Sequence, residues 1–531
     1  MFRSPFPDVE IPAVSVYDFL FRDLDAEDLD RIALVDGTSG AETTYRQLVS
    51  QVNLLAGALA SRGVGVGTVV GLHCPNVPAF ATVFHGILRA GATATTVNSL
   101  STGEEMAGQL TDAKATWLFT VSPLLAGAEE AAGRIGLAAD HVIVLDGADG
   151  HASLRDLLGE GRAAPDVAFD PATQVAVLPY SSGTTGTPKG VQLSHRNLVA
   201  NVLQCGPVLD VEAEDRVLAL LPFFHIYGMT VLLNIALERR ARLVTMPRFD
   251  LAEFLRIVSE HGCTYLFIAP PIGVALAKHP MVDRYDLSSV RAILSGAAPF
   301  DEALGRALAQ RLDARVRQGY GMTELSPVSH VIPPDRDDIS LGSIGVPVAN
   351  VESKLIDTET GEEIDLPAEG RSRPGELLVR GPNVMIGYLD RDEATHQTID
   401  ADGFLHTGDV ASVDSDGVLY IVDRLKELIK YKGYQVAPAE LEALLLTHPG
   451  IADAAVIGIP HEESGEAPKA FVVRSPGSAV TEDEVMAFVS EHVAPYKKVR
   501  SVEFVEAVPK SSSGKILRKD LKAREAAAAP G

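Results

Sequence analysis

Short apolar runs alternate with amphipathic segments from the start of the chain. Strands that alternate with helices favour parallel sheets whose faces are covered by helices. Residue type, run length and apolar spacing predict buried strands at 69–73, 117–121, 142–145 and 175–178, and helices at 45–62 and 79–90. The pattern therefore predicts an α/β fold.

Glycine-containing turns punctuate the second half of the chain. Residues 292–299 (AILSGAAP) have the pattern of a strand that ends in a tight turn, and residues 375–381 (GELLVRG) that of a strand between two turns. Asp416 and Gly417 form a hairpin-turn signal. By contrast, residues 147–165 are rich in Ala, Gly and Asp, and we expect them to form mobile surface.

The length and charge of the chain indicate a large body and a smaller module. A chain of 531 residues is too long for one core. The net charge of −25 argues against nucleic acid as a partner. All of the excess lies in residues 1–423, with 31 Lys and Arg against 56 Asp and Glu, whereas residues 424–531 carry 15 of each. We expect a large domain at 1–423 and a small one at 424–531, which can bring positive charge to an acidic body.

Cysteine usage and hydropathy exclude several further classes. Cys74, Cys205 and Cys263 lie far apart with no CxxC pair, which is typical of reduced core thiols rather than a metal cage. The first twelve residues do not resemble a signal peptide, and no apolar run approaches the ~20 residues of a membrane span. We therefore expect a cytoplasmic protein with no membrane partner.

The most informative stretch is Tyr180–Gly190 (YSSGTTGTPKG). It places five Ser and Thr side chains, three glycines and Lys189 between two apolar runs, as expected for a flexible hairpin tip. Backbone N–H groups, hydroxyls and an ammonium suit a polyphosphate. The spacing is not that of a Walker A loop. On composition alone, an ordinary Ser/Gly surface loop stays an equal alternative.

The string SSGTTGTPKG resembles the phosphate-binding signature of the adenylate-forming superfamily, which includes acyl-CoA synthetases, peptide-synthetase adenylation domains and luciferases. Further motifs follow in the family order: LPFFHIY at 221–227, QGYGMTE at 318–324, TGD at 407–409 and KSSSGK at 510–515. The opening FRSPFPDVEIP is similar to plant 4-coumarate–CoA ligases. The resemblance extends from Phe2 to about Lys519.

The resemblance implies a fold and a ligand set. The fold is a large N-terminal domain of stacked, mostly parallel sheets with helices and a β-barrel-like subdomain, followed by a small mobile α+β C-terminal domain. A hinge between the two falls at Asp423–Lys426. The ligands are ATP with Mg²⁺, CoA and a small carboxylic acid, and we expect a monomer or weak homodimer.

The family's ATP site can be placed on this sequence. Tyr320 offers a ring to adenine, Asp409 a carboxylate to the ribose, and Glu324 an oxygen ligand to Mg²⁺. The implied ATP-binding positions are Ser181, Ser182, Gly183, Thr184, Thr185, Lys189, Gln318, Gly319, Tyr320, Thr323, Asp409 and Arg424.

Two groups of charged residues are implied in catalysis. His225 would lie beside the substrate carboxylate and the α-phosphate, and Lys515 would bridge carboxylate and ATP. In a second arrangement, Lys430 and Gln435 would approach AMP. The remaining implied positions are Lys432 and Gly433 for CoA, Lys426 at the hinge, and Arg248 for the CoA nucleotide phosphate, where the plant enzymes have Lys. From spacing alone, a charged helix face and a solvated basic tail stay open as alternatives for these lysines.

The acyl pocket is implied by the same resemblance. Its residues are Tyr227, Leu294, Ala297, Gly321, Pro327, Val328 and Ser329. Ser329 stands where a bulkier apolar residue is common, and Leu294 where Met is often found. We therefore hypothesise extra room for ring substituents. The residues after Tyr227 include no Asp to pair with a substrate amine, which disfavours amino acids.

We therefore predict a 4-coumarate–CoA-ligase-like acyl-CoA synthetase that forms an acyl-AMP and then a thioester. Rotation of the small domain would exchange the Lys515 loop for the Lys430–Gln435 face. The alternatives are a medium-chain fatty acyl-CoA synthetase, an enzyme that loads a carrier protein, a luciferase-type oxygenase and an idle nucleotide-binding protein.

Overall fold

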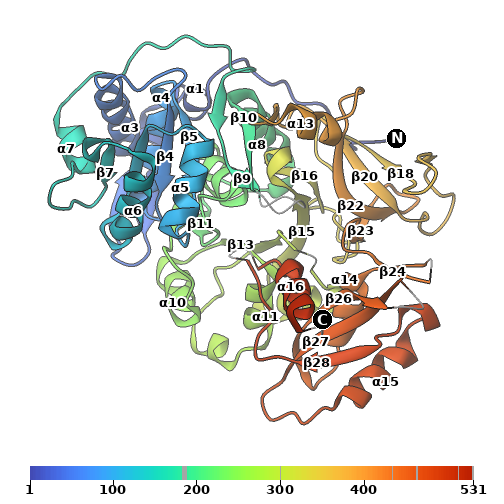
Figure 1. Ribbon diagram of the computed structural model, residues 1–531. Helices are drawn as coiled ribbons and strands as arrows, with labels where there is room; N and C mark the ends of the chain where they lie inside the picture. Colours follow the sequence, from blue (N-terminus) through green and yellow to red (C-terminus); the bar gives the residue numbers. More distant parts are fainter. Residues whose placement is uncertain (182–187, 299, 433, 462–464, 512–513, 529–531) are drawn as a thin grey trace.

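The computed structural model describes residues 1–181, 188–298, 300–432, 434–461, 465–511 and 514–528 (Figure 1). Two large mixed sheets form the body, an antiparallel sheet lies beside them, and a small sheet domain follows at the C-terminal end. The predicted fold class is confirmed.

The first large sheet has a parallel centre. Its order is β21-β10-β8-β5-β4-β6-β7, with β9 beside β10, and β10 runs antiparallel to β8 and β21. Its strands are β4 (Val69–His73), β5 (Thr93–Val97), β6 (Trp117–Thr120), β7 (Val142–Val144), β8 (Val175–Val177), β9 (Tyr180–Ser181), β10 (Lys189–Ser194) and β21 (Gly387–Tyr388). The four strands predicted for this region are all present.

The second large sheet carries most of the residues predicted to line the acyl pocket. Its order is β17-β16-β15-β14-β13-β11-β12-β2-β3, and the strands from β15 to β2 run parallel. The strands are β2 (Ile32–Asp36), β3 (Glu42–Thr44), β11 (Arg216–Ala219), β12 (Arg242–Thr245), β13 (Tyr265–Ile268), β14 (Ala292–Ser295), β15 (Arg315–Gly321), β16 (Val328–Val331) and β17 (Val346–Pro347).

The helices pack between and around these sheets. A capping box of Thr44 and Gln47 begins α3 (Tyr45–Ala60), and Pro78 occupies the first turn of α4 (Pro78–Arg89). Phe80 and Phe84 of α4 are fully buried in the main core. Both predicted helices are confirmed.

The predicted mobile surface at 147–165 is wrong in part. Ser153 caps α7 (Leu154–Gly159), and Leu157 of this helix is 1% exposed. The Ala-, Gly- and Asp-rich composition gave a wrong prediction here, because a single buried leucine and a helix cap suffice to anchor the segment against α3.

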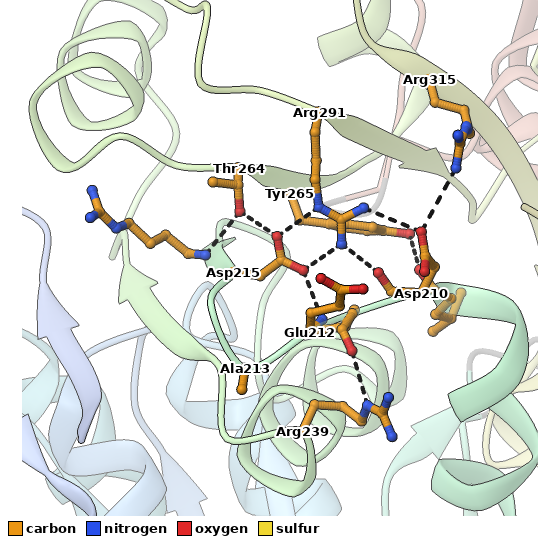
Figure 2. A network of polar contacts seen from close by, with 12 residues as sticks. Asp210, Glu212, Ala213, Asp215, Arg239, Thr264, Tyr265, Arg291 and Arg315 are labelled. Carbon is orange, nitrogen blue, oxygen red and sulfur yellow. Dashed lines mark hydrogen bonds and ion pairs between the residues drawn. The ribbon is translucent and has the colours of Figure 1, made fainter. Parts of the chain in front are cut away.

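The two ends of the second sheet differ. At the amino ends of its parallel strands, Asp215 accepts hydrogen bonds from Arg291 Nε (2.8 Å) and Thr264 Oγ1 (2.6 Å) (Figure 2). Burial opposes ionisation of Asp215, but these hydrogen bonds outweigh it and lower the pKa of the carboxyl. This network fastens the strands together. The opposite, carboxyl ends of β14 and β15 carry residues of the predicted site, as in other open α/β sheets.

The remaining two sheets are mainly antiparallel. A curled half-barrel consists of β1 (Phe2–Arg3), β18 (Glu352–Ile356), β19 (Glu363–Ile364), β20 (Gly375–Arg380), β22 (Leu405–Val413) and β23 (Leu419–Arg424). The C-terminal sheet consists of β24 (Ile429–Tyr431), β25 (Tyr434–Val436), β26 (Ile451–His461), β27 (Gly465–Arg474) and β28 (Ser501–Phe504). The predicted boundary at 423/424 falls within β23, just before its last residue, Arg424.

Candidate active site

The predicted phosphate loop joins two paired antiparallel strands, β9 and β10. Ser181 of β9 pairs with Lys189 of β10, and Lys189 Nζ lies 4.7 Å from the centre of the Tyr388 ring. The hairpin is confirmed. The predicted phosphate-binding residues Ser182, Gly183, Thr184 and Thr185 lie outside the described residues.

A buried charged cluster forms around Asp409. Tyr320 donates a 2.5 Å hydrogen bond to Asp409 Oδ2, and Arg424 Nε lies 3.2 Å from Oδ1. Asp409 is 5% exposed and faces Arg424 across the β22–β23 pair. Burial, followed by the Asp409 charge, raises the pKa of Tyr320 well above its usual value, so its hydroxyl stays a donor. Strands far apart in sequence therefore bring together three of the predicted ATP-binding residues.

Lys515 reaches this cluster from the C-terminal domain. It follows Gly514, whose φ of +82° suits glycine and whose Cα approaches Pro271 of α11 (Pro270–Lys278) in the large domain. Burial, followed by the Arg424 guanidinium, lowers the pKa of Lys515 to about 8, while Asp409 opposes the shift. The two domains thus enclose one lysine beside the proposed ribose carboxylate.

His225 lies close enough to Lys515 for the two side chains to interact electrostatically. Burial, and then the Lys515 ammonium, lower the pKa of His225 to about 4, so the imidazole is neutral near pH 7. Its Nδ1 accepts a 3.3 Å hydrogen bond from the Tyr227 amide. The resemblance implied that His225 and Lys515 both act at the substrate carboxylate, and the structure brings the two side chains near each other.

Glu324 lies near the phosphate hairpin. Its carboxylate is 3% exposed, and Oε1 accepts a 2.9 Å hydrogen bond from the Tyr388 hydroxyl. Oε2 has no hydrogen bond to any described residue. In the described part of the chain, no three His, Cys, Asp or Glu side chains gather as a metal cage. A single carboxylate fits Mg²⁺, which commonly takes one or two carboxylates and completes its shell with phosphates and water.

The first of the implied acyl-pocket residues, Tyr227, begins a helix with π-type hydrogen bonding, η3 (Tyr227–Asn234). The Tyr227 ring is 8% exposed, and its hydroxyl has no hydrogen-bond partner in the described structure. A Cβ on Gly296 would lie 3.1 Å from that hydroxyl, so only glycine leaves the ring its present place. Leu294 is buried one strand position before this turn, and Ala297 adopts a φ of +73°.

The other pocket residues follow β15. A Cβ on Gly321 would overlap the Pro327 carbonyl, so the two segments approach at glycine. Asn201 holds Val328 by accepting from its amide (3.0 Å) and donating to its carbonyl (2.7 Å). Ser329 Oγ lies 2.9 Å from Nδ1 of His330 and is fully buried. The hydroxyl of Ser329 is therefore already engaged within the protein.

The resemblance implied that Gln318 contacts the nucleotide, but its side chain bonds to backbone groups of the protein. Its Oε1 accepts from the Phe300 amide (2.8 Å), and its Nε2 donates to the carbonyls of Leu341 (3.1 Å) and Ser343 (2.7 Å). The side chain thus supports the end of the turn after β14. Gly319, the next residue, lies at the partly exposed end of β15. Thr323 lies in the partly exposed segment that follows this strand.

The second predicted group of lysines is apart from the buried cluster. Lys426, Lys430 and Lys432 are exposed, and Lys432 has a φ of +50° in the turn between β24 and β25. Arg248 is also exposed. Gly433 and the side chain of Gln435 lie outside the described residues.

Sequence reasoning did not single out Tyr388, which contacts both Lys189 and Glu324. Glu324 lies 64 positions earlier in the chain, so no local pattern predicts the contact. Only the three-dimensional structure reveals it.

Comparison with known proteins assigns the class. Residues 21–389 match the AMP-binding enzyme family, and residues 440–515 match the AMP-binding enzyme C-terminal domain. The chain therefore belongs to the AMP-binding, adenylate-forming enzyme family, as its motifs predicted. None of its described helices is long and apolar enough to cross a membrane.

Within the family the chain is similar to 4-coumarate–CoA ligases. It is 43% identical to 4-coumarate–CoA ligase 5 of Oryza sativa subsp. japonica over 541 residues, which cover 100% of this chain and 98% of the relative. It is an AMP-forming acyl-CoA ligase of this type.

Several solved structures share the fold of this chain over nearly its whole length. ATP-bound MatB from Rhodopseudomonas palustris aligns with a TM-score of 0.87 at 28% identity, over 97% of this chain and 99% of MatB. Apo MatB covers the same shares at 29% identity with a TM-score of 0.78. The anthranilate CoA ligase AuaEII in complex with anthranoyl-AMP gives 0.88 at 29% identity, over 98% and 99% of the two chains.

Proposed function

We propose that this ligase activates an aromatic carboxylic acid of the hydroxycinnamate class and transfers the acyl group to CoA. The full-length 43% identity to a 4-coumarate–CoA ligase is the observation that carries the proposal. The pocket is compatible with it, because Gly296 leaves room for the Tyr227 ring and Gly321 allows close backbone approach beside Val328. A flat ring fits between such surfaces.

In the first step the substrate carboxylate attacks the α-phosphate of ATP and pyrophosphate leaves. Two anions must meet, so fixed positive charge lowers the barrier. Lys515 supplies it in the enclosed cluster, Lys189 supplies it at the phosphate hairpin, and Asp409 holds the ribose. The neutral His225 lies where it can donate or accept a hydrogen bond without adding charge.

Glu324 would hold Mg²⁺ together with the phosphates of ATP. When bound, the ion offsets the negative charge that develops on the departing pyrophosphate. Glu324 would orient the ion, because the carboxylate is buried and one of its oxygens is already fixed by Tyr388.

In the second step the CoA sulfur attacks the acyl carbon and AMP leaves. We infer that the small domain turns near residues 424–426, withdraws Lys515 and presents Lys430, Lys432, Gly433 and Gln435, with Arg248 toward the CoA nucleotide. The higher similarity to ATP-bound than to apo MatB supports the interpretation that the present orientation serves the first step.

A hydroxamate assay over about twenty aromatic and aliphatic acids tests the substrate class. We expect kcat/KM for cinnamates to exceed that for octanoate by about tenfold or more, since a misfitting pocket commonly loses 1–3 kcal/mol. Equal or higher values for octanoate would contradict the proposal and favour a fatty acyl-CoA synthetase.

Ser329→Leu tests the proposed extra room. We expect the variant to lose about threefold to tenfold in kcat/KM for ring-dimethoxylated cinnamates relative to cinnamate, because added methylenes crowd a packed pocket. Ser353→Ala is a matched control, since it removes the other serine bonded to His330. If the rank order of kcat/KM among these cinnamates were unchanged in Ser329→Leu, Ser329 would not determine substrate specificity.

A further inference from the structure

Residues 383–389 form a bracket segment between the phosphate hairpin and the Glu324 loop. On one side, Tyr388 pairs with Val191 of β10, and the Leu389 amide donates to the Gly190 carbonyl (2.9 Å). On the other side, the Met385 amide donates to the carbonyl of Glu324 (2.9 Å). The segment therefore fixes the spacing between two loops that the proposed mechanism needs at one triphosphate.

Tyr388 repeats this bridge with its side chain. Its hydroxyl donates to Glu324 Oε1 at 2.9 Å, and its ring face lies 4.7 Å from Lys189 Nζ. The residue is 8% exposed, and its amide donates to Thr395 Oγ1 (2.9 Å). A buried, anchored ring has little freedom, so both contacts are held in one geometry.

The hydroxyl is suited to act as a donor. It points at Glu324 Oε1, and a phenol ordinarily keeps its proton at physiological pH. A donor on Oε1 fixes the plane of the carboxylate and leaves Oε2 for an ion. Partners of this kind commonly change metal affinity by 10- to 100-fold when they are removed.

We propose that Tyr388 is a positioning residue that couples the metal carboxylate Glu324 to the phosphate-hairpin lysine Lys189. The hydroxyl orients Glu324 for Mg²⁺, and the ring face holds the Lys189 ammonium toward the phosphates. This inference deepens the proposed function and rests on the roles proposed there for Glu324 and Lys189.

Calorimetric binding of the non-reacting analogue α,β-methylene-ATP separates the two contacts. Binding is measured in EDTA and over a Mg²⁺ series for the wild type, Tyr388→Phe, Tyr388→Met and Glu324→Gln. We expect Tyr388→Phe to raise the half-saturating Mg²⁺ concentration about tenfold and to leave binding in EDTA unchanged, because the ring remains. Tyr388→Met should also weaken binding in EDTA about threefold to tenfold, because the ammonium loses its aromatic partner.

Tyr420→Phe is the matched control. The Tyr420 hydroxyl also donates to a carboxylate, Asp414 Oδ2 (3.1 Å), and Arg371 lies 3.4 Å from its ring centre. Tyr420 lies on β23 of the half-barrel, and the control should change neither measurement. Thermal unfolding of each variant verifies that it is folded.

The double variant Tyr388→Phe/Glu324→Gln completes the test. If Tyr388 acts through Glu324, the double variant has the Mg²⁺ requirement of Glu324→Gln alone, and this holds even if Tyr388→Met does not fold. A wild-type Mg²⁺ requirement in Tyr388→Phe, with a raised one in Glu324→Gln, would overturn the inference alone. No change in Glu324→Gln would instead overturn the proposed metal role of Glu324.

Discussion

The C-terminal domain presents two lysine-bearing loops in contrasting environments. The Lys515 loop is enclosed against the large domain, where burial lowers the pKa of the lysine to about 8. The β24–β25 turn is exposed, and Tyr434 beside it is 55% accessible and stacks on Tyr496 at 4.5 Å. In the proposed mechanism, the Lys515 loop therefore acts in this orientation, and the β24–β25 turn acts only after the small domain turns.

This difference explains how an acidic chain can handle a nucleotide triphosphate. The large domain carries the whole charge excess, yet its buried Asp409 already meets Tyr320, Arg424 and the approaching Lys515. In the proposed mechanism, Lys515 brings positive charge from the neutral small domain and adds to that of Lys189 in the body. Variants of each loop should then affect separate steps.

The largest effect is expected for Lys515→Ala. Loss of a half-buried, positioned cation should lower ATP–pyrophosphate exchange about 10³-fold, while thioester formation from supplied acyl-AMP stays within about threefold of wild type. Lys519→Ala is a control on the same terminal segment. Equal loss of both half-reactions in Lys515→Ala would contradict separate roles for the loops.

Lys430→Ala should show the converse pattern with a smaller magnitude. Misplaced reactants typically cost about 10²-fold, so single-turnover thioester formation should fall by that order while pyrophosphate exchange remains. Lys498→Ala, in the same domain, tests for a general charge effect. If exchange fell as much as thioester formation, Lys430 would not belong to a second arrangement.

The smallest effect is a pH dependence. Lys515 acts as an ammonium and has a pKa of about 8 in the folded protein, so kcat/KM for adenylation should fall about tenfold per pH unit above that value. His225, with a pKa of about 4, should add no acidic limb between pH 6 and 8. Pyrophosphate exchange from pH 6 to 9.5 measures both.

Lys515→Arg sharpens this test because a guanidinium stays charged throughout the range. The variant should lose the alkaline limb even if its maximal rate is reduced. An unchanged limb near pH 8 would assign the titration to another group.

The sequence predicted much of the framework because its signals are local. Short-range apolar spacing and turn residues predicted three of its elements. These are the Tyr180–Gly190 hairpin, the strand that begins AILSGAAP and the helix that begins at Tyr45. The resemblance implied that Lys515 acts at the ATP site during adenylation, but the domain orientation that brings it to the Asp409 cluster could not be predicted from the sequence.

The features that escaped prediction depend on tertiary contacts. Tyr388 acquires its place only where β21 meets β10, and the Gln318 amide is taken up by three backbone groups from other segments. The π-type geometry of η3 likewise has no distinctive apolar period. Such features require the folded chain.

A reversible lock of the small domain tests the central claim most directly. A Cβ on Gly514 would lie 3.7 Å from Ala269 Cβ, close to the mean spacing in disulfides, so Gly514→Cys/Ala269→Cys should link the domains in this orientation. The native Cys74, Cys205 and Cys263 are buried, and burial raises their thiol pKa values, so they should not compete.

Each single variant and the reduced double variant show what the substitutions alone cost, including the strain of a side chain at the positive φ of residue 514. The oxidised double variant should retain the pyrophosphate exchange of its reduced form but lose CoA-thioester formation, and reduction should restore it. Undiminished thioester turnover in the fully oxidised protein would contradict exchange of the two lysine loops.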